Sequence, residues 1–191
     1  MVPPRSHCRV ITVLNLKGGV GKTHSTWLLA SVCQERGKRV LLIDTDAQGN
    51  LSNSFVRDGR REPGVEQLLD PSLDADVHSL IRRTTFPAID ILPASPAIGQ
   101  FDLSDQRAWE KAYLHRSFLD PIRAVQPHYD FVVFDCPPRL SLASFAAHLW
   151  LIAPRNSLGV SPVWPLCQSP LDEKICSNEG PRADVYSVMQ V

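Results

Sequence analysis

The sequence lacks an excess of charge of either sign, because 20 lysines and arginines balance 20 aspartates and glutamates among its 191 residues. A chain without net charge has no overall field to draw it to nucleic acid or to an anionic membrane. Long hydrophobic runs are also missing. The longest nearly apolar stretch, residues 140–153, contains two serines and a histidine, and it is shorter than the roughly 20 residues of a membrane span. We therefore expect no membrane partner.

Clustered cysteines and a secretory leader are missing too. The five cysteines are an odd number without zinc-site spacing, which favours reduced thiols over a disulfide framework or a zinc site. Residues 3–5, Pro-Pro-Arg, lead directly into a β-prone run, where a secretory signal has a longer apolar segment. We expect a cytoplasmic protein with one domain and a substantial core.

The most informative feature that is present is the segment 16–23, Leu-Lys-Gly-Gly-Val-Gly-Lys-Thr. It follows an apolar, β-prone run over residues 9–14 and precedes a helical pattern over 22–36 that ends at Gly37. A strand, a glycine-rich turn and a helix N-terminus together form a phosphate cradle, because glycines let backbone N–H groups converge on anionic oxygens.

Two lysines flank this turn. Lys22 can reach the outer phosphates of a nucleotide, and the Thr23 hydroxyl suits a Mg²⁺ ion. An ordinary P-loop has glycine five positions before Gly21, where this chain has Leu16 followed by Lys17. Two ammonium groups repel each other unless a polyanion lies between them, so the spacing favours a triphosphate.

Residues 17–23 resemble the deviant Walker A motif of the ParA/MinD group of P-loop ATPases. Two further segments match this group in the expected order. Residues 44–50, Asp-Thr-Asp-Ala-Gln-Gly-Asn, are similar to the family's Asp-x-Asp-Pro-Gln-Gly-Asn, and residues 129–138 resemble its Walker B strand and the turn after it. The Gln-Gly-Asn ending and the Asp-Cys-Pro-Pro turn favour the ParA partition branch over MinD. The resemblance covers residues 9–147.

This resemblance implies ATP as the nucleotide and Mg²⁺ as the metal ion. Lys17 matches the signature lysine that reaches across a nucleotide-sandwich dimer, and Asp46 matches the carboxylate that orients the attacking water; both are expected to be catalytic. The implied metal site consists of Thr23, Asp44 and Asp135. Structural roles stay open at this point: a solvated loop lysine for Lys17, and helix or strand caps for Asp46 and Asp135.

His24 stands where the family has threonine or serine, and we interpret it as a helix surface variant rather than a catalyst. It still lies within the implied nucleotide-binding segment. That segment consists of Lys17, Gly18, Gly19, Val20, Gly21, Lys22, Thr23 and His24.

The period of the apolar residues alternates between strand-like and helix-like along the chain, which predicts an α/β fold: a doubly wound, mostly parallel sheet of the P-loop NTPase type with helices on both faces. A long helix is expected from Asp105, broken or restarted at Pro121 with Asp120 as a new cap. Residues 51–75 are expected to be polar surface structure around one short helix. Strands are predicted over 9–14, 39–44, 89–92 and 131–134, and short helices over 65–69 and 77–81.

Beyond about residue 147 the pattern fails. The family continues with a further strand and helices that are not recognisable here, and prolines at 154, 162, 165 and 170 interrupt any long element. We expect residues 1–147 to be the N-terminal part of a ParA-type ATPase domain, truncated after the Walker B region. Residues 148–191 are expected to be an irregular tail, either divergent or frameshifted, and the abrupt break favours a frameshift.

The function that these residues favour is an ATP-binding and ATP-hydrolysing partition protein. It would dimerise on ATP and respond to a ParB-like partner, so that a plasmid, chromosome or other cargo is segregated. The alternative is a catalytically incompetent nucleotide-binding fragment without partition activity. The family binds DNA non-specifically and associates with the nucleoid, but the zero net charge argues against tight DNA binding here. Arg57, Arg60 and Arg61 are interpreted as a solvated loop rather than a DNA patch.

Overall fold

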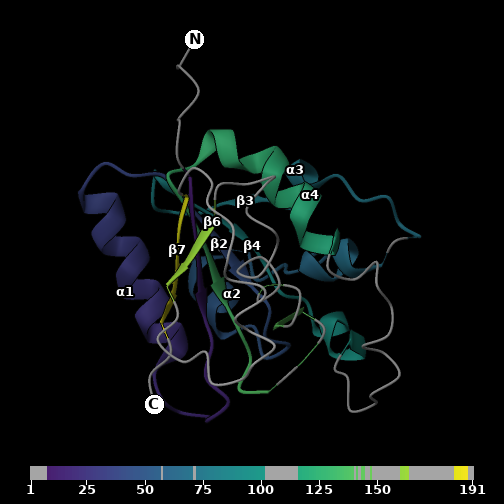
Figure 1. Ribbon diagram of the computed structural model, residues 1–191. Coiled ribbons are helices and arrows are strands. Elements are labelled where there is room, and N and C mark those ends of the chain that lie inside the picture. Colours follow the sequence, from purple (N-terminus) through teal and green to yellow (C-terminus); the bar gives the residue numbers. More distant parts are fainter. Residues whose placement is uncertain are drawn as a thin grey trace, which may run out of the picture.

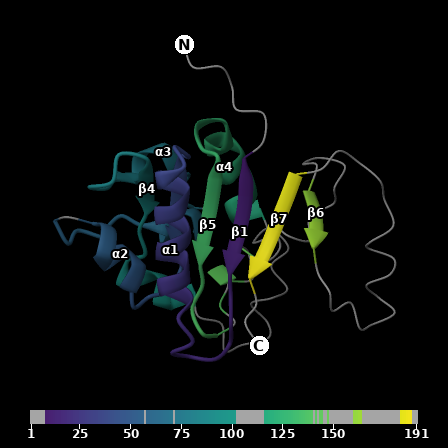
Figure 2. The ribbon, with the colours of Figure 1, turned by 90° about the vertical axis from the view of Figure 1, so that its left-hand side faces the viewer.

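The computed structural model describes residues 8–56, 58–70, 72–101, 116–139, 141, 143–144, 147, 160–163 and 183–188. Within these residues the chain forms a seven-stranded sheet in the order β3-β4-β2-β5-β1-β7-β6, with helices on both faces (Figures 1 and 2). All strand pairs are parallel except β3 with β4. The strands are β1 (Arg9–Val13), β2 (Val40–Asp44), β3 (Arg82–Arg83), β4 (Ile89–Leu92), β5 (Phe131–Asp135), β6 (Val160–Val163) and β7 (Ala183–Val188).

The helices occupy the connections between these strands. The α-helices are α1 (Lys22–Glu35), α2 (Asn50–Phe55), α3 (Val77–Leu80) and α4 (Arg116–Val125). The 3₁₀ helices are η1 (Val65–Leu69), η2 (Pro96–Phe101) and η5 (Gln126–His128).

The central strand β2 shows why the sheet needs cover on both faces. Leu41 and Ile43 pack into one hydrophobic cluster together with residues of α4, η1 and η2. Val40 and Leu42 point to the opposite face and pack into a second cluster with residues of α1 and α2. Successive side chains of a strand alternate between faces, and an apolar residue at every position therefore requires a helical layer on each side.

The parallel register brings three strand ends together at one edge. Val13 at the end of β1 and Asp44 at the end of β2 both lie opposite Asp135 at the end of β5. In an open α/β sheet, ligands bind outside the carboxyl ends of the strands. The glycine-rich segment, which follows β1, and the turn after β2 therefore meet at this edge.

The predicted α/β fold and its mostly parallel sheet are confirmed. The four predicted strands correspond to β1, β2, β4 and β5 within one residue at each end. Helix α1 begins at Lys22 and ends just before Gly37, whose φ of 68° supplies the left-handed conformation of a helix C-terminus. The two short helices were also placed correctly, at η1 and α3.

The prediction of polar surface structure over residues 51–75 is wrong for residues 51–55. Residues Asn50–Phe55 form α2, and Leu51, Ser52 and Phe55 are buried. The helix has too few turns for its apolar period to show in a polar segment. Burial of one face against the sheet, rather than local propensity, stabilises it.

The predicted break at Pro121 is also wrong, because Pro121 lies inside α4. Phe118, Ile122 and Val125 on this helix are fully buried in the first hydrophobic cluster. We attribute the continued helix to this packing, which outweighs the lost N–H donor of one proline. The predicted helix start at Asp105 lies outside the described residues.

The expectation of an irregular tail does not hold for two described segments. Strand β7 pairs in parallel with β1, and β6 pairs in parallel with β7. Pro162 lies within β6, the last strand in the order that the described residues form, and the edge of a sheet is a position that tolerates proline. The other prolines of this region lie outside the described residues.

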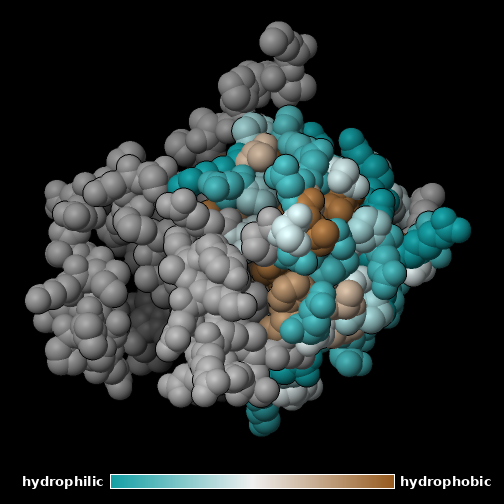
Figure 3. Space-filling view, turned by 90° about the vertical axis from the view of Figure 1, so that its right-hand side faces the viewer, coloured by the Kyte–Doolittle hydropathy of each residue, from teal (hydrophilic) through white to brown (hydrophobic). Residues whose placement is uncertain are grey.

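The described surface carries only scattered large apolar side chains. Leu16 is exposed in the glycine-rich segment, and Leu28 and Val32 are exposed on α1. Figure 3 shows a mainly hydrophilic face with a smaller hydrophobic group within it. None of the helices in the described ranges has the length and hydrophobicity needed to cross a membrane.

Candidate functional site

The turn between β1 and α1 has the backbone of a phosphate cradle. Gly19 and Gly21 have φ values of 73° and 86°, in the left-handed region that favours glycine. A side-chain atom added at Gly18, Gly19 or Gly21 would meet nothing within 4 Å, so the turn is open. Gly21 is the N-cap of α1, and no side chain caps this helix end. Its first N–H groups therefore face an open turn, as an anion site at a helix N-terminus requires.

Both predicted lysines help to shape this turn. The Lys22 ammonium donates a hydrogen bond to the Lys17 carbonyl oxygen at 3.2 Å, and the Lys17 N–H donates to Asn15 Oδ1 at 2.8 Å. Lys22 is half-buried at the helix start, whereas the Lys17 side chain is exposed. The two positive charges thus belong to one turn. His24 is exposed on α1, in agreement with its interpretation as a surface variant.

Asp135 lies beneath this turn at the end of β5 and is almost fully buried. The Thr26 hydroxyl donates to Asp135 Oδ1 at 3.4 Å. Burial, and then the negative charge of Asp44, raise the pKa of Asp135 to about 7, while the Thr23 hydrogen bond opposes the rise. A buried carboxylate that stays this poorly stabilised suits a site that receives a cation.

Asp44 accepts three hydrogen bonds within its own segment. Its Oδ2 accepts from the Ser52 N–H at 2.8 Å and from the Ser52 hydroxyl at 2.7 Å. Its Oδ1 accepts from the Asp46 N–H at 3.0 Å. Burial raises the pKa of Asp44 to about 6, against the effect of these hydrogen bonds. These bonds tie Asp44 to the turn after β2 and to the start of α2, and its role as a Mg²⁺ ligand stays a prediction.

Asp46 lies in the turn between β2 and α2. Its Oδ1 accepts from the Gln48 N–H at 3.0 Å, and its carbonyl oxygen accepts from the Gly49 N–H at 2.8 Å. The N-cap of α2 is Gly49, without a side-chain cap. Asp46 therefore does not cap α2. Asp44 is the carboxylate that accepts a hydrogen bond from a free N–H group at the start of this helix, that of Ser52. Asp46 is half-buried beside this edge of the sheet.

Sequence reasoning missed Ser52. Its hydroxyl donates to Asp44 and accepts from the Ala94 N–H at 2.9 Å, so it links the ends of β2 and β4. The pattern contained no signal for this role because α2 was not predicted. A serine two residues after the Gly49-Asn50 pair would have suggested it only with that helix in place.

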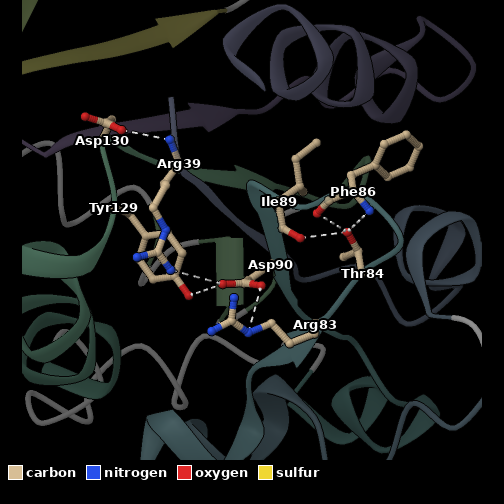
Figure 4. Close-up of polar contacts among 8 residues, drawn as sticks. All are labelled: Arg39, Arg83, Thr84, Phe86, Ile89, Asp90, Tyr129 and Asp130. Atoms are coloured by element: carbon tan, nitrogen blue, oxygen red, sulfur yellow. Dashed lines mark hydrogen bonds and ion pairs between the residues drawn. The ribbon is translucent and has the colours of Figure 1, made fainter. Parts of the chain in front are cut away.

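Another buried carboxylate, Asp90, lies near the amino end of β4, and Figure 4 shows its contacts. It accepts a hydrogen bond from the Tyr129 hydroxyl at 2.8 Å. The Arg39 and Arg83 guanidinium groups each approach it at 3.7 Å, and Arg39 also lies over the Tyr129 ring, 5.2 Å from its centroid. The charge of Asp90 is thus balanced by this chain's own residues.

The described residues contain no group of three or more His, Cys, Asp or Glu side chains arranged to hold a metal ion. A Mg²⁺ ion bound with a nucleotide does not need such a group, because phosphate oxygens and water supply most of its ligands. Thr23 at the start of α1 and Asp135 at the end of β5 carry hard oxygen donors of this kind.

The family model described as an AAA domain matches residues 8–151. The sporulation initiation inhibitor protein Soj of Bacillus subtilis is 34% identical over 141 residues, which are 73% of this chain and 53% of Soj. The chromosome partitioning protein ParA of Caulobacter vibrioides is 36% identical over 143 residues, 73% of this chain and 51% of that protein. The chain thus spans about half the length of these relatives.

Solved structures agree with the fold. A cobyrinic acid a,c-diamide synthase from Mycobacterium smegmatis, with bound ADP and magnesium, has a TM-score of 0.64 at 28% identity and covers 73% of this chain and 55% of its own. A plasmid partition protein from Borrelia burgdorferi, bound to AMPPNP, has a TM-score of 0.61 at 22% identity. The match covers 75% of this chain and 60% of that protein's chain. The second likeness bears on the fold alone.

Proposed function

This chain belongs to the AAA domain family as a ParA-type P-loop ATPase sequence, and from that premise we propose that it binds ATP with Mg²⁺ at the carboxyl edge of its sheet and hydrolyses it. The observation that carries the proposal is the position of Asp135. Its carboxylate is buried at the end of β5, accepts a hydrogen bond from Thr26 of α1 and lies opposite Asp44, and its raised pKa reflects a negative charge that a bound cation would stabilise.

The open turn and the start of α1 would hold the phosphates. The backbone N–H groups of the turn and the Lys22 ammonium supply hydrogen bonds and positive charge for the outer phosphates. Lys22 already lies within the turn through its bond to the Lys17 carbonyl oxygen. The exposed Lys17 side chain is free to act elsewhere, and we assign it to the phosphates of a partner subunit in an ATP-dependent homodimer.

Thr23 and Asp135 would hold Mg²⁺, with Asp44 behind them as a positioning residue. When bound, Mg²⁺ neutralises the charge of the phosphate oxygens, which is the main demand of phosphoryl transfer. Asp46 would orient the attacking water, because one of its oxygens is engaged in the turn and its side chain is half-buried at this edge. Positioning and charge, rather than covalent chemistry, account for the activity.

The names of the relatives support a partition role, in which turnover is stimulated by a ParB-like partner and drives segregation of a cargo. Non-specific DNA binding is expected to be weak at physiological salt, since the chain has no net charge. A nucleotide-binding fragment without turnover is the alternative that the same site supports.

Calorimetry with ATP and MgCl₂ tests the proposal. We expect Lys22→Ala to lower the affinity for ATP by roughly 100-fold, because a charge-assisted contact to phosphate is lost. Lys38→Ala is the matched control: Lys38 is an exposed lysine just before β2, at the other end of the sheet, and its removal should leave the affinity unchanged. Equal affinities of the wild type and Lys22→Ala would refute the site.

Turnover separates the two alternatives. Phosphate release by the wild type supports the ATPase, and ATP binding without release supports the nucleotide-binding fragment. Lys17→Ala should retain binding by the monomer but lose ATP-dependent dimers in light scattering. Dimers that persist in this variant would refute the role of Lys17.

A further inference from the structure

Arg61 is not the solvated loop residue that the sequence suggested. It lies in the connection between α2 and η1, yet its guanidinium reaches back to the turn that carries Asp46. Arg61 Nη1 donates a hydrogen bond to the Gln48 carbonyl oxygen at 3.2 Å. The side chain is half-buried, and it covers Gly49: a Cβ atom added there would overlap the guanidinium group and lie 2.7 Å from Arg61 Cζ.

The chain that follows Arg61 is anchored to the sheet. The Val65 N–H donates to the Pro93 carbonyl oxygen, just after β4, at 2.8 Å. In a second hydrogen bond, Arg82 Nη2 donates to the Glu62 carbonyl oxygen at 3.3 Å. Gly64 is buried so tightly that an added Cβ would overlap the Pro93 carbonyl oxygen. Arg61 therefore projects from a well-supported segment.

The turn that Arg61 covers is otherwise held by its own hydrogen bonds and by Ala47, which packs against the first hydrophobic cluster. Asp46 contacts Gln48 and Gly49 within the turn itself, and Asp44 holds the turn from the inner side. Gly49 has a φ of 62°, in the left-handed region that favours glycine. Because glycine has no side chain, the Arg61 guanidinium can also approach its backbone closely. The planar guanidinium covers the backbone and donates at the same time, which a lysine ammonium cannot do.

We propose that Arg61 is a positioning residue that clamps the turn 46–49 and thereby fixes the Asp46 carboxylate for turnover, a role that rests on the proposed ATPase function. Arg61 acts through Asp46 and not on the nucleotide. Its loss should therefore lower kcat while leaving the affinity for ATP nearly unchanged.

Steady-state kinetics of three variants test this role. We expect Arg61→Ala to lower kcat about fivefold with a KM for ATP within about twofold of the wild type. Arg61→Lys, which keeps one donor but loses the planar cover, should retain an intermediate kcat. Arg60→Ala is the matched control, because Arg60 is an exposed neighbour, and its kcat should equal that of the wild type. An unchanged kcat in Arg61→Ala, with the wild type active, would overturn the inference.

The Asp46→Ala background separates positioning from a general loss of structure. If Arg61 acts through Asp46, adding Arg61→Ala to Asp46→Ala should cause no further loss of kcat. A further loss of similar size would overturn the inference. Circular dichroism and thermal melting confirm that each variant is folded.

Hydrogen exchange of the Gln48 and Gly49 amides, followed by NMR in the nucleotide-free protein, tests the clamp without activity. Both amides bond to Asp46, and in Arg61→Ala we expect them to exchange at least about threefold faster. Unchanged exchange would overturn the clamp. A wild type that binds no ATP would overturn the proposed function alone, and the exchange rates would still decide the role of Arg61.

Discussion

Buried carboxylates have different partners at the two ends of the sheet. At the amino end, Asp90 is surrounded by Arg39, Arg83 and the Tyr129 hydroxyl (Figure 4). At the carboxyl end, Asp44 and Asp135 lie opposite each other. Neither of these two forms an ion pair with any residue in the described part of the chain, and burial raises the pKa of both.

This difference indicates which end carries the chemistry. The chain's own cations satisfy the carboxylate at the amino end, which therefore stabilises the fold and needs no ligand. The carboxyl end leaves two negative charges incompletely compensated, at a cost in stability that a bound cation and nucleotide would remove. Stability and function thus make opposite demands on the same residue type at the two ends.

The largest expected effect at the carboxyl end is on turnover. Asp46→Ala should lower kcat at least tenfold, roughly the contribution of a group that positions the attacking water, while ATP binding in calorimetry changes little. Asp120→Ala on α4 is the control, since Asp120 is exposed and pairs only across one helical turn with Arg123. Unchanged turnover in Asp46→Ala would return this residue to a structural role.

At the amino end we expect a loss of stability without a loss of activity. Asp90→Asn should lower the free energy of unfolding by about 2 kcal/mol, because it removes the buried charge that faces two arginines. The Arg39 side chain is 37% exposed and that of Arg83 is 78% exposed, which keeps the effect below that of a fully buried pair. Urea denaturation measures the change, and ATP turnover at a temperature where the variant is folded should equal that of the wild type. A drop in turnover would show that the two ends are not independent.

The smallest expected effect has the opposite sign. Asp135→Asn should raise the free energy of unfolding of the nucleotide-free protein by about 1 kcal/mol at pH 8, the size of typical stabilising changes at functional sites. The pKa of Asp135 is about 7 in the folded protein, against a reference value of 3.8. The stability contribution of the protonated group is therefore fully present below about pH 3.8 and is lost as the pH rises through 7. The advantage of the variant should shrink toward pH 4, and a variant less stable than the wild type at pH 8 would contradict this account.

Much of the fold and site could be predicted from local patterns. Four apolar runs predicted the strands that carry the site, and the glycine-rich segment predicted where α1 begins. Asp135 ends the parallel strand β5, and Lys22 and Thr23 begin the helix that follows β1 through the glycine-rich turn. These features depend on sequence neighbours and on the general rule that parallel strands end together.

The missed features depend on contacts between distant segments. The Ser52 hydroxyl donates to Asp44 only because α2 folds against the sheet. Arg61 reaches the turn of Asp46 only because the segment after Arg61 is anchored at Pro93. Strands β6 and β7 were not predicted, because the prolines of this region indicate interrupted secondary structure. A strand at the edge of a sheet, such as β6 in the described order, nevertheless tolerates a proline.

The sequence by itself determined the alternation of strands and helices, the glycine-rich turn and the identity of the acidic residues near it. These properties follow from short-range periodicity and from the conformational freedom of glycine. Only the tertiary structure decided which of these acids are buried, which of them hydrogen-bond to the start of α2, and which arginines are solvated. Burial, charge compensation and side-chain reach are set by neighbours in space, and the linear order of residues does not specify them.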